Sequence, residues 1–527
     1  MRTLSVLPFS ASRYRLRPHQ RSFPAAPSAG KIVFRYLLGL FLLGVALSSC
    51  RPDEIVARGP LDLRFSQDTV YLDTVIDSIG SSTYALKVYN DGQETVRIEE
   101  IRLADPASPY RINVNGEKGP VVQNVEILPE DSIYVFVEVT TSIQGSAEML
   151  VTDQLLFSGG GRSQEVELVT LAREAVFHFP QRFLVLGTGE NATPIPYSVI
   201  SCNTRWTADK PHVVYGYAVV DSGCTLTIEP GAEVRFHQNS GLWVFDQGRL
   251  DVAPNAFPGQ GDSVTFTSDR LEPGFEDSPG QWGGALGGIY IGQGARAEIN
   301  NAVIKNATNA LRVDSATMTD QLVLRNSYIL NSSRTGLSAG FSNIKAENLV
   351  VANSGLYNLY AFGGNYRFLH CTFANYWSGS TRQEPAVLLT NFFEFTDENG
   401  AQQRVVRPIQ SAYFGNCIVY GNNNKELAIS QDDAAALNFT FNHAMLRLPR
   451  DTADRSLNLQ DPGFQNVLVN QAPDFLDGPN NQYALDSTSQ AVDQGNVADG
   501  AAVQIDIRGR TRNFNGIPDL GAFERQF

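Results

Sequence analysis

One short phrase recurs along the chain at nearly constant spacing. Within each copy, β-branched or aromatic residues alternate with polar ones between Asn, Ser and Gly, a pattern typical of a strand that runs into a tight turn. A fixed period in this range predicts a stacked architecture, in which each unit buries its apolar face only against its neighbours. The phrases are NAVIKN from Asn301, NSYILN from Asn326, NLVVAN from Asn348, HCTFAN from His370 and NCIVYG from Asn416.

The starting positions of these phrases are 25, 22, 22 and 46 residues apart, so the last interval predicts two coils, one of them degenerate. Strands at this period, with no helical pattern between them, predict a parallel β-helix with one coil per period. The Asn that ends four of the phrases is expected to stack on its counterpart in the next coil, because such amide ladders satisfy buried turn hydrogen bonds. We also expect Asn326, Asn348 and His370 to face the same turn on successive coils.

The first fifty residues carry a targeting signal rather than part of the fold. An apolar run of eleven residues, from Leu37 to Leu47, is too short to span a membrane and follows basic residues, as in a secretory signal. The run leads into LSSC, ending at Cys50, which resembles the lipobox of bacterial lipoproteins. The resemblance implies that residues 1–50 are a lipoprotein signal peptide ending at the lipobox and that Cys50 is acylated. The alternative is ordinary cleavage nearby, which would leave Cys50 as a free thiol.

The sequence RPDE directly after Cys50 resembles the signal that sends lipoproteins of Bacteroidetes-type bacteria to the outer face of the outer membrane. The resemblance implies an outer-membrane lipoprotein exposed at the cell surface, with residues 51–60 as its linker; a plain solvated linker is the alternative. Its expected membrane partner is outer-membrane lipid, through the acylated Cys50.

The charge balance disfavours anionic partners. The whole chain has 41 Lys and Arg against 55 Asp and Glu, and residues 1–50 hold seven of the basic residues and none of the acidic ones. The remaining chain therefore has a formal charge of −21. Such a surface disfavours nucleic acid and anionic lipid headgroups as partners.

Residues 61–175 have short alternating strands separated by turn residues, which predicts an antiparallel β-sandwich. The segments KVYNDG, RIEEIRL and ILPEDSIYVFVEV resemble the immunoglobulin-like modules that bacterial surface proteins use as spacers. The resemblance implies a spacer, and no cluster of charged residues or His in this region suggests chemistry.

Residues 176–527 are the second predicted domain. The segment TLTIEPGAEVRFHQNSGLWVFDQGRLDV resembles the first coils of bacterial right-handed parallel β-helices of the pectate-lyase-like class, and QWGGALGGIYIG and SAYFGNCIVYGN also resemble members of that class. DIRGRTRNFNGIPDLGAFE resembles its closing segment, here residues 486–527, whose acids and arginines are expected to cover the open last coil. The fold class is therefore expected to be all-β, an N-terminal sandwich followed by a β-helix solenoid. The resemblance brings no catalytic residue set with it.

Cys202 and Cys224 are 22 residues apart, one period of the repeat, at the start of the expected stack. The secretory signal implies a compartment that permits disulfides, and a bridge here would stabilise the first coil by about 3 kcal/mol. Cys371 and Cys417 occupy equivalent places in their phrases, but a degenerate coil between them would separate their α-carbon atoms by about 10 Å, beyond disulfide reach. We expect a Cys202 to Cys224 disulfide and two reduced core thiols.

Lys345 and Arg367 are one period apart, so they are expected to stack on one outward face. Two neighbouring cations favour an anionic ligand, and polysaccharide lyases on this fold use a cation to neutralise a uronate carboxylate while a base removes the adjacent proton. Lys345, Arg367 and His370 are therefore candidate catalytic residues. His370, however, occupies the place of Asn326 and Asn348 in their phrases, which favours a satisfied core histidine over a catalytic one.

Other candidate chemistry is sparse. No zinc-type spacing is present, so no metal site or cofactor is predicted, although loop Asp and Asn residues could hold Ca²⁺. Loop carboxylates such as Asp432 with Asp433, or Asp269 with Glu272, could hydrolyse glycosides only if their carboxyl groups lay about 5 to 9 Å apart. With 55 acidic residues, neighbouring pairs also arise by chance.

These observations favour a cell-surface lipoprotein whose β-helix serves as a glycan-contacting or adhesive module. Two alternatives remain: a polysaccharide lyase or hydrolase with a site on the flank around Lys345, and a structural envelope component. The aromatic residues that could contact sugar are Tyr357, Tyr360, Tyr366, Tyr376 and Trp377.

Overall fold

The fold is that of a computed structural model. The predicted signal peptide, Cys50 and all of the predicted linker except Pro60 lie outside the described residues. Within them, strands form nearly all of the regular structure, which confirms the all-β class; the helices are α2 (Val497–Ala502) and the 3₁₀ helix η2 (Gly478–Asn480). The structure describes residues 60–526 apart from 144–146, 188–191, 273, 285, 317–318, 398–399, 450–456 and 513.

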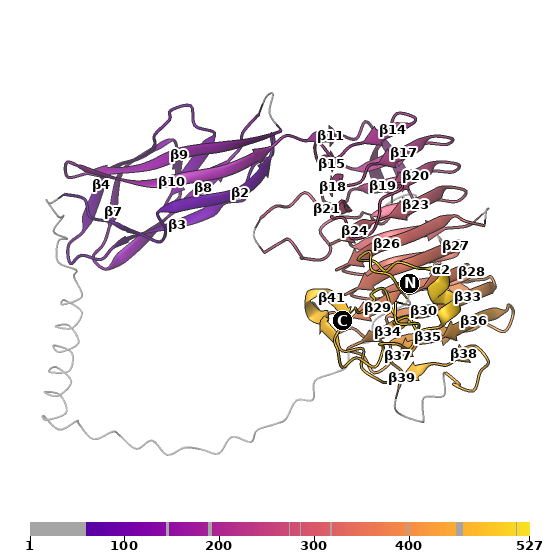
Figure 1. The fold of residues 1–527 in the computed structure, drawn as a ribbon. Helices are drawn as coiled ribbons and strands as arrows, with labels where there is room; N and C mark the ends of the chain where they lie inside the picture. The colour runs from indigo at the N-terminus through magenta and orange to yellow at the C-terminus, as the bar shows by residue number, and fades with distance from the viewer. Residues whose placement is uncertain are drawn as a thin grey trace, which may run out of the picture.

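Residues 64–173 form two five-stranded sheets, here called the two-sheet region (Figure 1). Apolar and polar residues alternate along its strands, so that every second side chain points inward. The inward side chains of both sheets, among them Val88, Val135 and Leu155, meet in one core. The first sheet has the order β1 (Arg64–Phe65), β3 (Tyr84–Asn90), β8 (Asp131–Val139), β5 (Tyr110–Val114), β6 (Glu117–Gly119), and the second β2 (Thr69–Ile76), β10 (Arg162–Arg173), β9 (Glu148–Gly159), β4 (Val96–Leu103), β7 (Val121–Ile127).

One strand pair departs from the predicted antiparallel arrangement. β2 pairs with β10 in parallel, with Thr69 opposite Glu167, whereas β10 pairs with β9 in the antiparallel direction. A tight turn forces antiparallel pairing only on strands that it joins directly, and β2 and β10 come from opposite ends of the region. The second sheet is therefore mixed.

Residues 176–469 form a tall stack of strands, here called the stacked region (Figure 1). Most of its strands pair in parallel with the strand three positions later in the chain, so that Leu226 lies opposite Leu250 and Leu250 opposite Ala297. One passage of the chain through three such strands is called a coil here. Successive coils build three parallel ladders, and the long strands β26, β27 and β28 each belong to two or three of them.

The strands of the three ladders are as follows. The first ladder contains β13 (Thr193–Val199), β16 (Tyr217–Val220), β19 (Gly241–Val244), β22 (Ile289–Ile291), β25 (Asn309–Asp314), β27 (Thr335–Ala352), β28 (Leu359–Leu369), β30 (Val387–Thr390) and β35 (Leu427–Ser430); β12 (Arg182–Leu186) pairs with β13 in the antiparallel direction. The second contains β14 (Thr204–Trp206), β17 (Thr225–Ile228), β20 (Arg249–Val252), β23 (Arg296–Asn300), β26 (Leu322–Leu330), β27, β28, β33 (Ile409–Gly415), β36 (Leu437–Asn442) and β38 (Phe464–Gln465). The third contains β11 (Val176–His178), β15 (His212–Val214), β18 (Glu233–Phe236), β21 (Val264–Ser268), β24 (Ala302–Lys305), β26, β27, β29 (Thr372–Asn375), β34 (Ile418–Gly421), β37 (Met445–Leu446) and β39 (Leu468–Val469).

Side chains that point into the stack form continuous apolar columns from coil to coil. In the first ladder, Leu311, Leu337 and Leu359 lie opposite one another and are fully buried. In the second, the rings of Phe368 and Phe414 stack with centroids 4.9 Å apart. Because each coil buries its apolar side chains against the next, the period of the sequence matches the period of the structure.

The interval of 46 residues between the last two phrases contains one coil rather than the two predicted. Thr372 in β29 lies directly opposite Ile418 in β34. Part of this coil leaves the stack as an antiparallel hairpin of β31 (Phe392–Thr396) and β32 (Gln402–Val406). The prediction of a degenerate coil was wrong because the length of an interval does not distinguish a second coil from a hairpin inserted into one coil.

Each phrase begins at a bend with left-handed backbone: φ is 49° at Asn326, 52° at Asn348, 51° at His370 and 54° at Asn416. Asn and His adopt this conformation more readily than most residues. The side chains bond along the stack, since Nδ2 of Asn348 donates to Oδ1 of Asn326 at 2.8 Å and Nδ2 of Asn416 lies 3.0 Å from Nε2 of His370. The register predicted for Asn326, Asn348 and His370 is confirmed.

The Asn residues that end the phrases do not form the predicted ladder, in which each would bond to its counterpart in the next coil. Nδ2 of Asn353 donates to Oδ1 of Asn481 at 2.8 Å, and Nδ2 of Asn481 reaches Oδ1 of Asn331 at 3.4 Å. Asn375 donates to the carbonyl of Ser354 at 2.9 Å. Asn481, which is more than a hundred residues further along the chain, therefore joins the turns at Asn331 and Asn353.

Cys202 and Cys224 form the predicted disulfide, with α-carbon atoms 4.8 Å apart. Cys371 and Cys417 are free and buried, as expected. The prediction that a degenerate coil separates Cys371 from Cys417 was wrong. The interval contains one long coil, so the two residues lie in neighbouring coils. Burial and the nearby thiol of Cys371 raise the pKa of Cys417 well above its ordinary value, so the thiol stays protonated.

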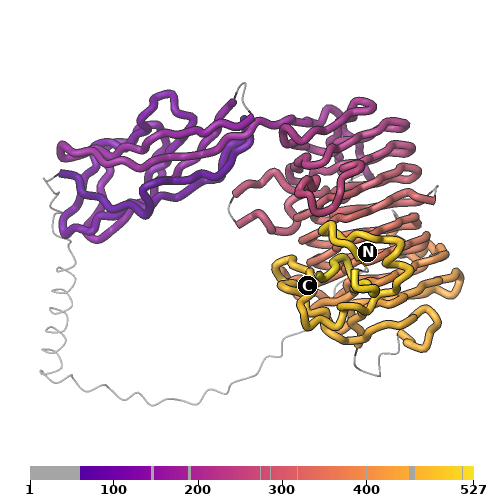
Figure 2. Tube along the Cα trace, in the orientation of Figure 1, coloured from indigo at the N-terminus to yellow at the C-terminus, as the bar shows by residue number. Residues whose placement is uncertain are grey.

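The C-terminal segment, residues 471–526, packs along the third ladder rather than over the last coil as predicted for residues 486–527 (Figure 2). It contains β40 (Phe475–Asp477), η2, β41 (Gln482–Leu485) and α2. The outward side chains of the third ladder include Val350 and Ile418, which would expose an apolar flank to water. Tyr483 and Phe523 pack against the first of these and Leu520 against the second, so the segment covers a side of the stack.

We predict that Asn348→Ala lowers the free energy of unfolding by about 2 kcal/mol, because it removes the bond to Asn326 and leaves buried partners unpaired. Asn255→Ala is the matched control, since Asn255 shares the left-handed backbone but is exposed. Chemical denaturation of both variants measures the difference. Equal losses in the two variants would show that the bend conformation, and not the ladder of side chains, holds the register.

Candidate functional site

A groove of about 480 Å³ lies on the outer face of the first ladder. Its lining residues come from the consecutive strands β22, β25, β27 and β28, so the groove crosses the strands and follows the stack from coil to coil. Phe393 of the β31–β32 hairpin adds a wall. The volume falls within the range of small-molecule sites.

Four outward residues of neighbouring coils form the floor of the groove. Tyr290 lies opposite Arg312, Arg312 opposite Ser338, and Ser338 opposite Tyr360. These positions alternate with the inward leucine column, which makes them face away from the core. The small side chain of Ser338 lies between the long side chains of Arg312 and Tyr360 and lines the groove.

A continuous row of five aromatic rings borders this floor. The centroids of Tyr357 and Tyr360 are 5.3 Å apart, those of Tyr360 and Phe362 5.3 Å, and those of Phe362 and Phe393 5.0 Å. Phe395 follows at 6.0 Å from Phe393 and is 40% exposed. Stacked rings at these distances hold one another in place and present flat apolar surface beside polar groups.

The hairpin is held against the stack by polar contacts. Arg404 pairs with Glu394 and, at 2.8 Å, with Asp432, and its guanidinium lies 4.4 Å from the ring centroid of Phe392. Nδ2 of Asn391 donates to the carbonyl of Asp432 at 2.7 Å. Asp432, one of the carboxylates considered for hydrolysis, thus holds the hairpin that forms the wall of the groove. Hydrogen bonds from the Ala434 N–H and from Arg404 lower the pKa of Asp432.

The charges inside the groove neutralise each other. Nη2 of Arg312 lies 2.6 Å from Oδ2 of Asp314, and the guanidinium lies 5.0 Å from the ring centroid of Tyr290. Burial raises the pKa of Tyr290 to about 12 and also raises the pKa of Tyr360. Both hydroxyl groups therefore remain protonated at neutral pH and can donate hydrogen bonds.

The predicted lyase residues are only partly brought together. Lys345 lies opposite Arg367 and Arg367 opposite Tyr413 on the second ladder, which confirms the stacked cations. Lys345 pairs with Asp320 at 2.7 Å. His370 is fully buried at its bend, and burial together with Arg512 holds its pKa well below the ordinary value. A neutral, enclosed imidazole cannot reach the proton of a polymeric substrate, so this group lacks its base.

The charged residues near the C-terminus, Asp506, Arg512, Asp519 and Glu524, are also buried. Asp506 accepts hydrogen bonds from the backbone N–H groups of Arg508, Arg510 and Glu524, and Asp519 from those of Asp493 and Arg525. Their carboxylates organise turns of the segment. Burial and the nearby Asp519 raise the pKa of Glu524 to about 7, an effect that the attraction of Arg512 only partly offsets.

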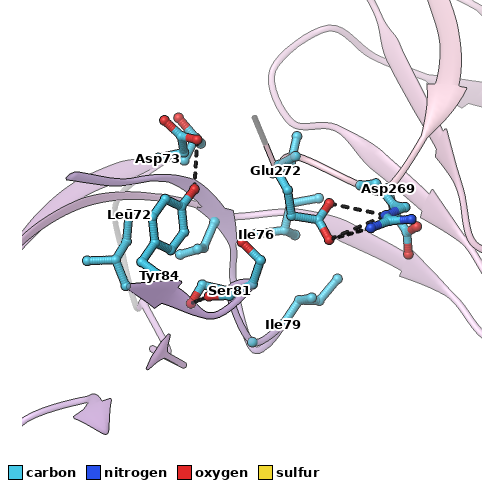
Figure 3. Close-up of a pocket in the computed structure, with 14 residues that line it drawn as sticks. Leu72, Asp73, Ile76, Ile79, Ser81, Tyr84, Asp269 and Glu272 are labelled. Atoms are coloured by element: carbon cyan, nitrogen blue, oxygen red, sulfur yellow. Dashed lines mark hydrogen bonds and ion pairs between the residues drawn. The ribbon is translucent and has the colours of Figure 1, made fainter. Parts of the chain in front are cut away.

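Asp269 and Glu272 lie in a pocket of about 150 Å³ where a loop of the stacked region meets the two-sheet region (Figure 3). Glu272 accepts from Arg270 at 3.1 Å, and Oδ2 of Asp269 lies 2.8 Å from Nδ1 of His237. Each carboxylate is engaged by its own partner. Both partners belong to the stacked region, so these carboxylates are paired within it at the edge of the pocket.

Of the five aromatic residues named from the sequence, Tyr357 and Tyr360 belong to the row of rings beside the groove. Tyr366 is buried inside the stack, where its hydroxyl donates to the carbonyl of Ala339 at 3.0 Å. The sequence reasoning missed the residues that complete the groove, because they lie outside the five phrases, on other parts of the stack and on the inserted hairpin. These are Tyr290, Arg312, Ser338, Phe341, Phe362 and Phe393.

Within the described ranges, no group of three or more His, Cys, Asp or Glu side chains is placed so that it could hold a metal ion. A search of the same residues for an apolar helix long enough to cross a membrane found none.

No protein-family model and no curated protein matches the chain. Among solved structures, PapD-like domain 7 of human CEP192 is similar at 11% identity and a TM-score of 0.16, over 24% of this chain and 96% of that chain. The Salmonella enterica SafA pilin in complex with the SafB chaperone has 12% identity over 27% and 70%, and the E. coli chaperone DraB 12% over 28% and 71%, both at a TM-score of 0.16. Similarity at this level assigns neither a family nor a function.

We predict that Glu524 makes the stacked region less stable as pH rises from about 4.5 to 7. Its pKa is about 7 in the folded chain against 4.5 for an ordinary Glu, so in this window the unfolded chain loses a proton that the folded chain keeps. Glu524→Gln cannot ionise, so the difference in melting temperature between this variant and wild type should shift by roughly 3 °C or more in favour of the variant from pH 5 to pH 8. Calorimetry of both proteins at pH 5 and at pH 8 measures this shift.

Glu117→Gln, on an exposed strand of the two-sheet region, is the control and should follow wild type at both pH values. A constant difference between wild type and Glu524→Gln across this pH range would contradict the buried, protonated state of Glu524.

Proposed function

We propose that this chain is an outer-membrane lipoprotein, exposed at the cell surface, whose stacked region binds a glycan in the aromatic groove. In this proposal the stacked region is a right-handed parallel β-helix and the two-sheet region an immunoglobulin-like spacer. The parallel pairing of strands three positions apart, at a sequence period of 22 residues, supports the first assignment. The shared core of two sheets supports the second.

The groove is the observation that carries the binding function. Aromatic rings give the apolar faces of a sugar a flat surface to lie against, and the tyrosine hydroxyls and the groove's amide groups can bond to its hydroxyl groups. The floor extends over four coils, from Tyr290 to Tyr360, or about 14 Å at the spacing of neighbouring strands. That length suits an oligosaccharide better than a single sugar.

Catalysis is a weaker candidate for this chain. Lys345 and Arg367 could neutralise an acidic sugar, but His370 lies inside the stack beneath the C-terminal segment. A structural role without ligand is the remaining alternative, and the binding experiment below distinguishes it.

We predict that Tyr360→Ala weakens glycan binding roughly tenfold or more, because truncating a central aromatic contact of a binding site costs about 2 kcal/mol. A glycan array, followed by calorimetry with the glycan retained best, measures the affinity. Tyr71→Ala is the matched control, since Tyr71 is 66% exposed in the two-sheet region, and it should bind as wild type does. If folded wild type binds no glycan, or if both variants bind equally, the groove is not the site.

The membrane anchor is tested separately. We predict that Cys50→Ser moves the protein from the membrane fraction to the soluble fraction, because acyl chains on Cys50 are the proposed attachment. Fractionation with immunoblotting measures this. Surface exposure requires that protease added to intact cells degrade the wild-type protein. Retention of Cys50→Ser in the membrane would refute the anchor, and protection from protease would refute the surface location.

A further inference from the structure

Resting on the proposed function, we infer that the groove takes a neutral, hydroxyl-rich glycan rather than an anionic one. The charges at the groove and the positions of the stacked cations support this class of ligand.

The two charged side chains that line the groove are already paired with each other. Arg312 and Asp314 are separated by 2.6 Å, and the guanidinium also lies across Tyr290. A uronate or sulfate entering the groove would have to compete with Asp314 for Arg312 and would lie beside the carboxylate it displaced. Like charges at that distance repel, so the pair disfavours an anion and leaves a neutral sugar unaffected.

The other polar groups of the groove suit hydroxyl groups. Asn309, Gln293, Ser315 and Ser338 line it together with the hydroxyls of Tyr290 and Tyr360. Amides and hydroxyls both donate and accept hydrogen bonds, as a sugar hydroxyl does, whereas a carboxylate only accepts. Such a lining can satisfy each hydroxyl of a neutral glycan without a charged partner.

Two stacked cations that could attract an acidic polymer lie away from the groove. Lys345 and Arg367 are on the second ladder, while the groove is on the first. A further cation, Arg407, lies at the rim of the groove, with its guanidinium 5.9 Å from the ring centroid of Phe341. The chain after residue 50 carries a formal charge of −21, which disfavours polyanions as partners. The stacked cations are therefore separate from the aromatic groove, and Arg407→Gln tests the cation at its rim.

The experiment compares matched soluble probes with the full chain lacking residues 1–50. The neutral probes are β-1,4-linked oligomers of glucose, mannose and xylose and α-linked oligomers of glucose, and the acidic probes are oligogalacturonate and oligomannuronate. We expect at least one neutral series to bind, with affinity rising from the monosaccharide to the trimer. Its affinity should change less than about twofold between 50 and 300 mM NaCl, because no charge pair forms.

Two variants distinguish an error in the class of glycan from an error in the binding site. Tyr360→Ala should abolish binding of the neutral probe, and Arg407→Gln should leave it unchanged. Binding of an acidic probe alone, lost in Tyr360→Ala, weakened in Arg407→Gln and falling steeply with salt, would overturn the neutral class while leaving glycan binding in the groove intact. Binding of no probe of either class by the folded protein would overturn the proposed function itself.

Discussion

The parallel pairing of one coil with the next, held in register at the bends, is the constraint on which the stacked region depends. A strand that slipped by one residue would turn its apolar column outward. The left-handed residues Asn326, Asn348, His370 and Asn416 prevent this by fixing where the chain bends from the second ladder into the third, and two pairs of them also bond to each other across coils. These bends are local in sequence, so the same short phrase can be repeated to extend the stack.

The groove lies where the repeat is broken. A strict repeat would present the same outward residues on every coil and would form a flat ladder with no depression. The groove arises because Ser338 is small between Arg312 and Tyr360, and because one coil is lengthened by a hairpin whose Phe393 reaches back to Phe362. The inserted hairpin costs little, since the stack continues beneath it with Thr372 opposite Ile418.

The sequence predicted those features that depend on local spacing. The all-β class, the register of Asn348 and the Cys202–Cys224 disulfide all follow from a period that can be counted. It failed where distant segments meet, as in the parallel contact of β2 with β10 and the position of the C-terminal segment. The β31–β32 hairpin was missed for another reason, because the length of an interval does not distinguish an inserted hairpin from a second coil. The sequence identified only some residues of the aromatic groove. Tyr357 and Tyr360 follow a phrase closely, whereas Tyr290 and Phe393 are distant from it in sequence and approach these tyrosines only in the folded chain.

The three ladders differ in what covers them. In its later coils, from Val350 to Ile418, the outward side of the third ladder is apolar and lies under the C-terminal segment, where Arg512 reaches Oδ1 of Asn348 at 2.8 Å across 164 residues of sequence. The second ladder carries ion pairs such as Arg249 with Asp251 and Arg296 with Glu298, which keep it solvated. The first ladder carries half-buried rings such as Tyr290 and Tyr360 beside the Arg312–Asp314 pair. Because the C-terminal segment that covers the third ladder also encloses His370, this imidazole is not exposed beside the stacked cations. The proposed glycan binding therefore depends on the aromatic groove of the first ladder.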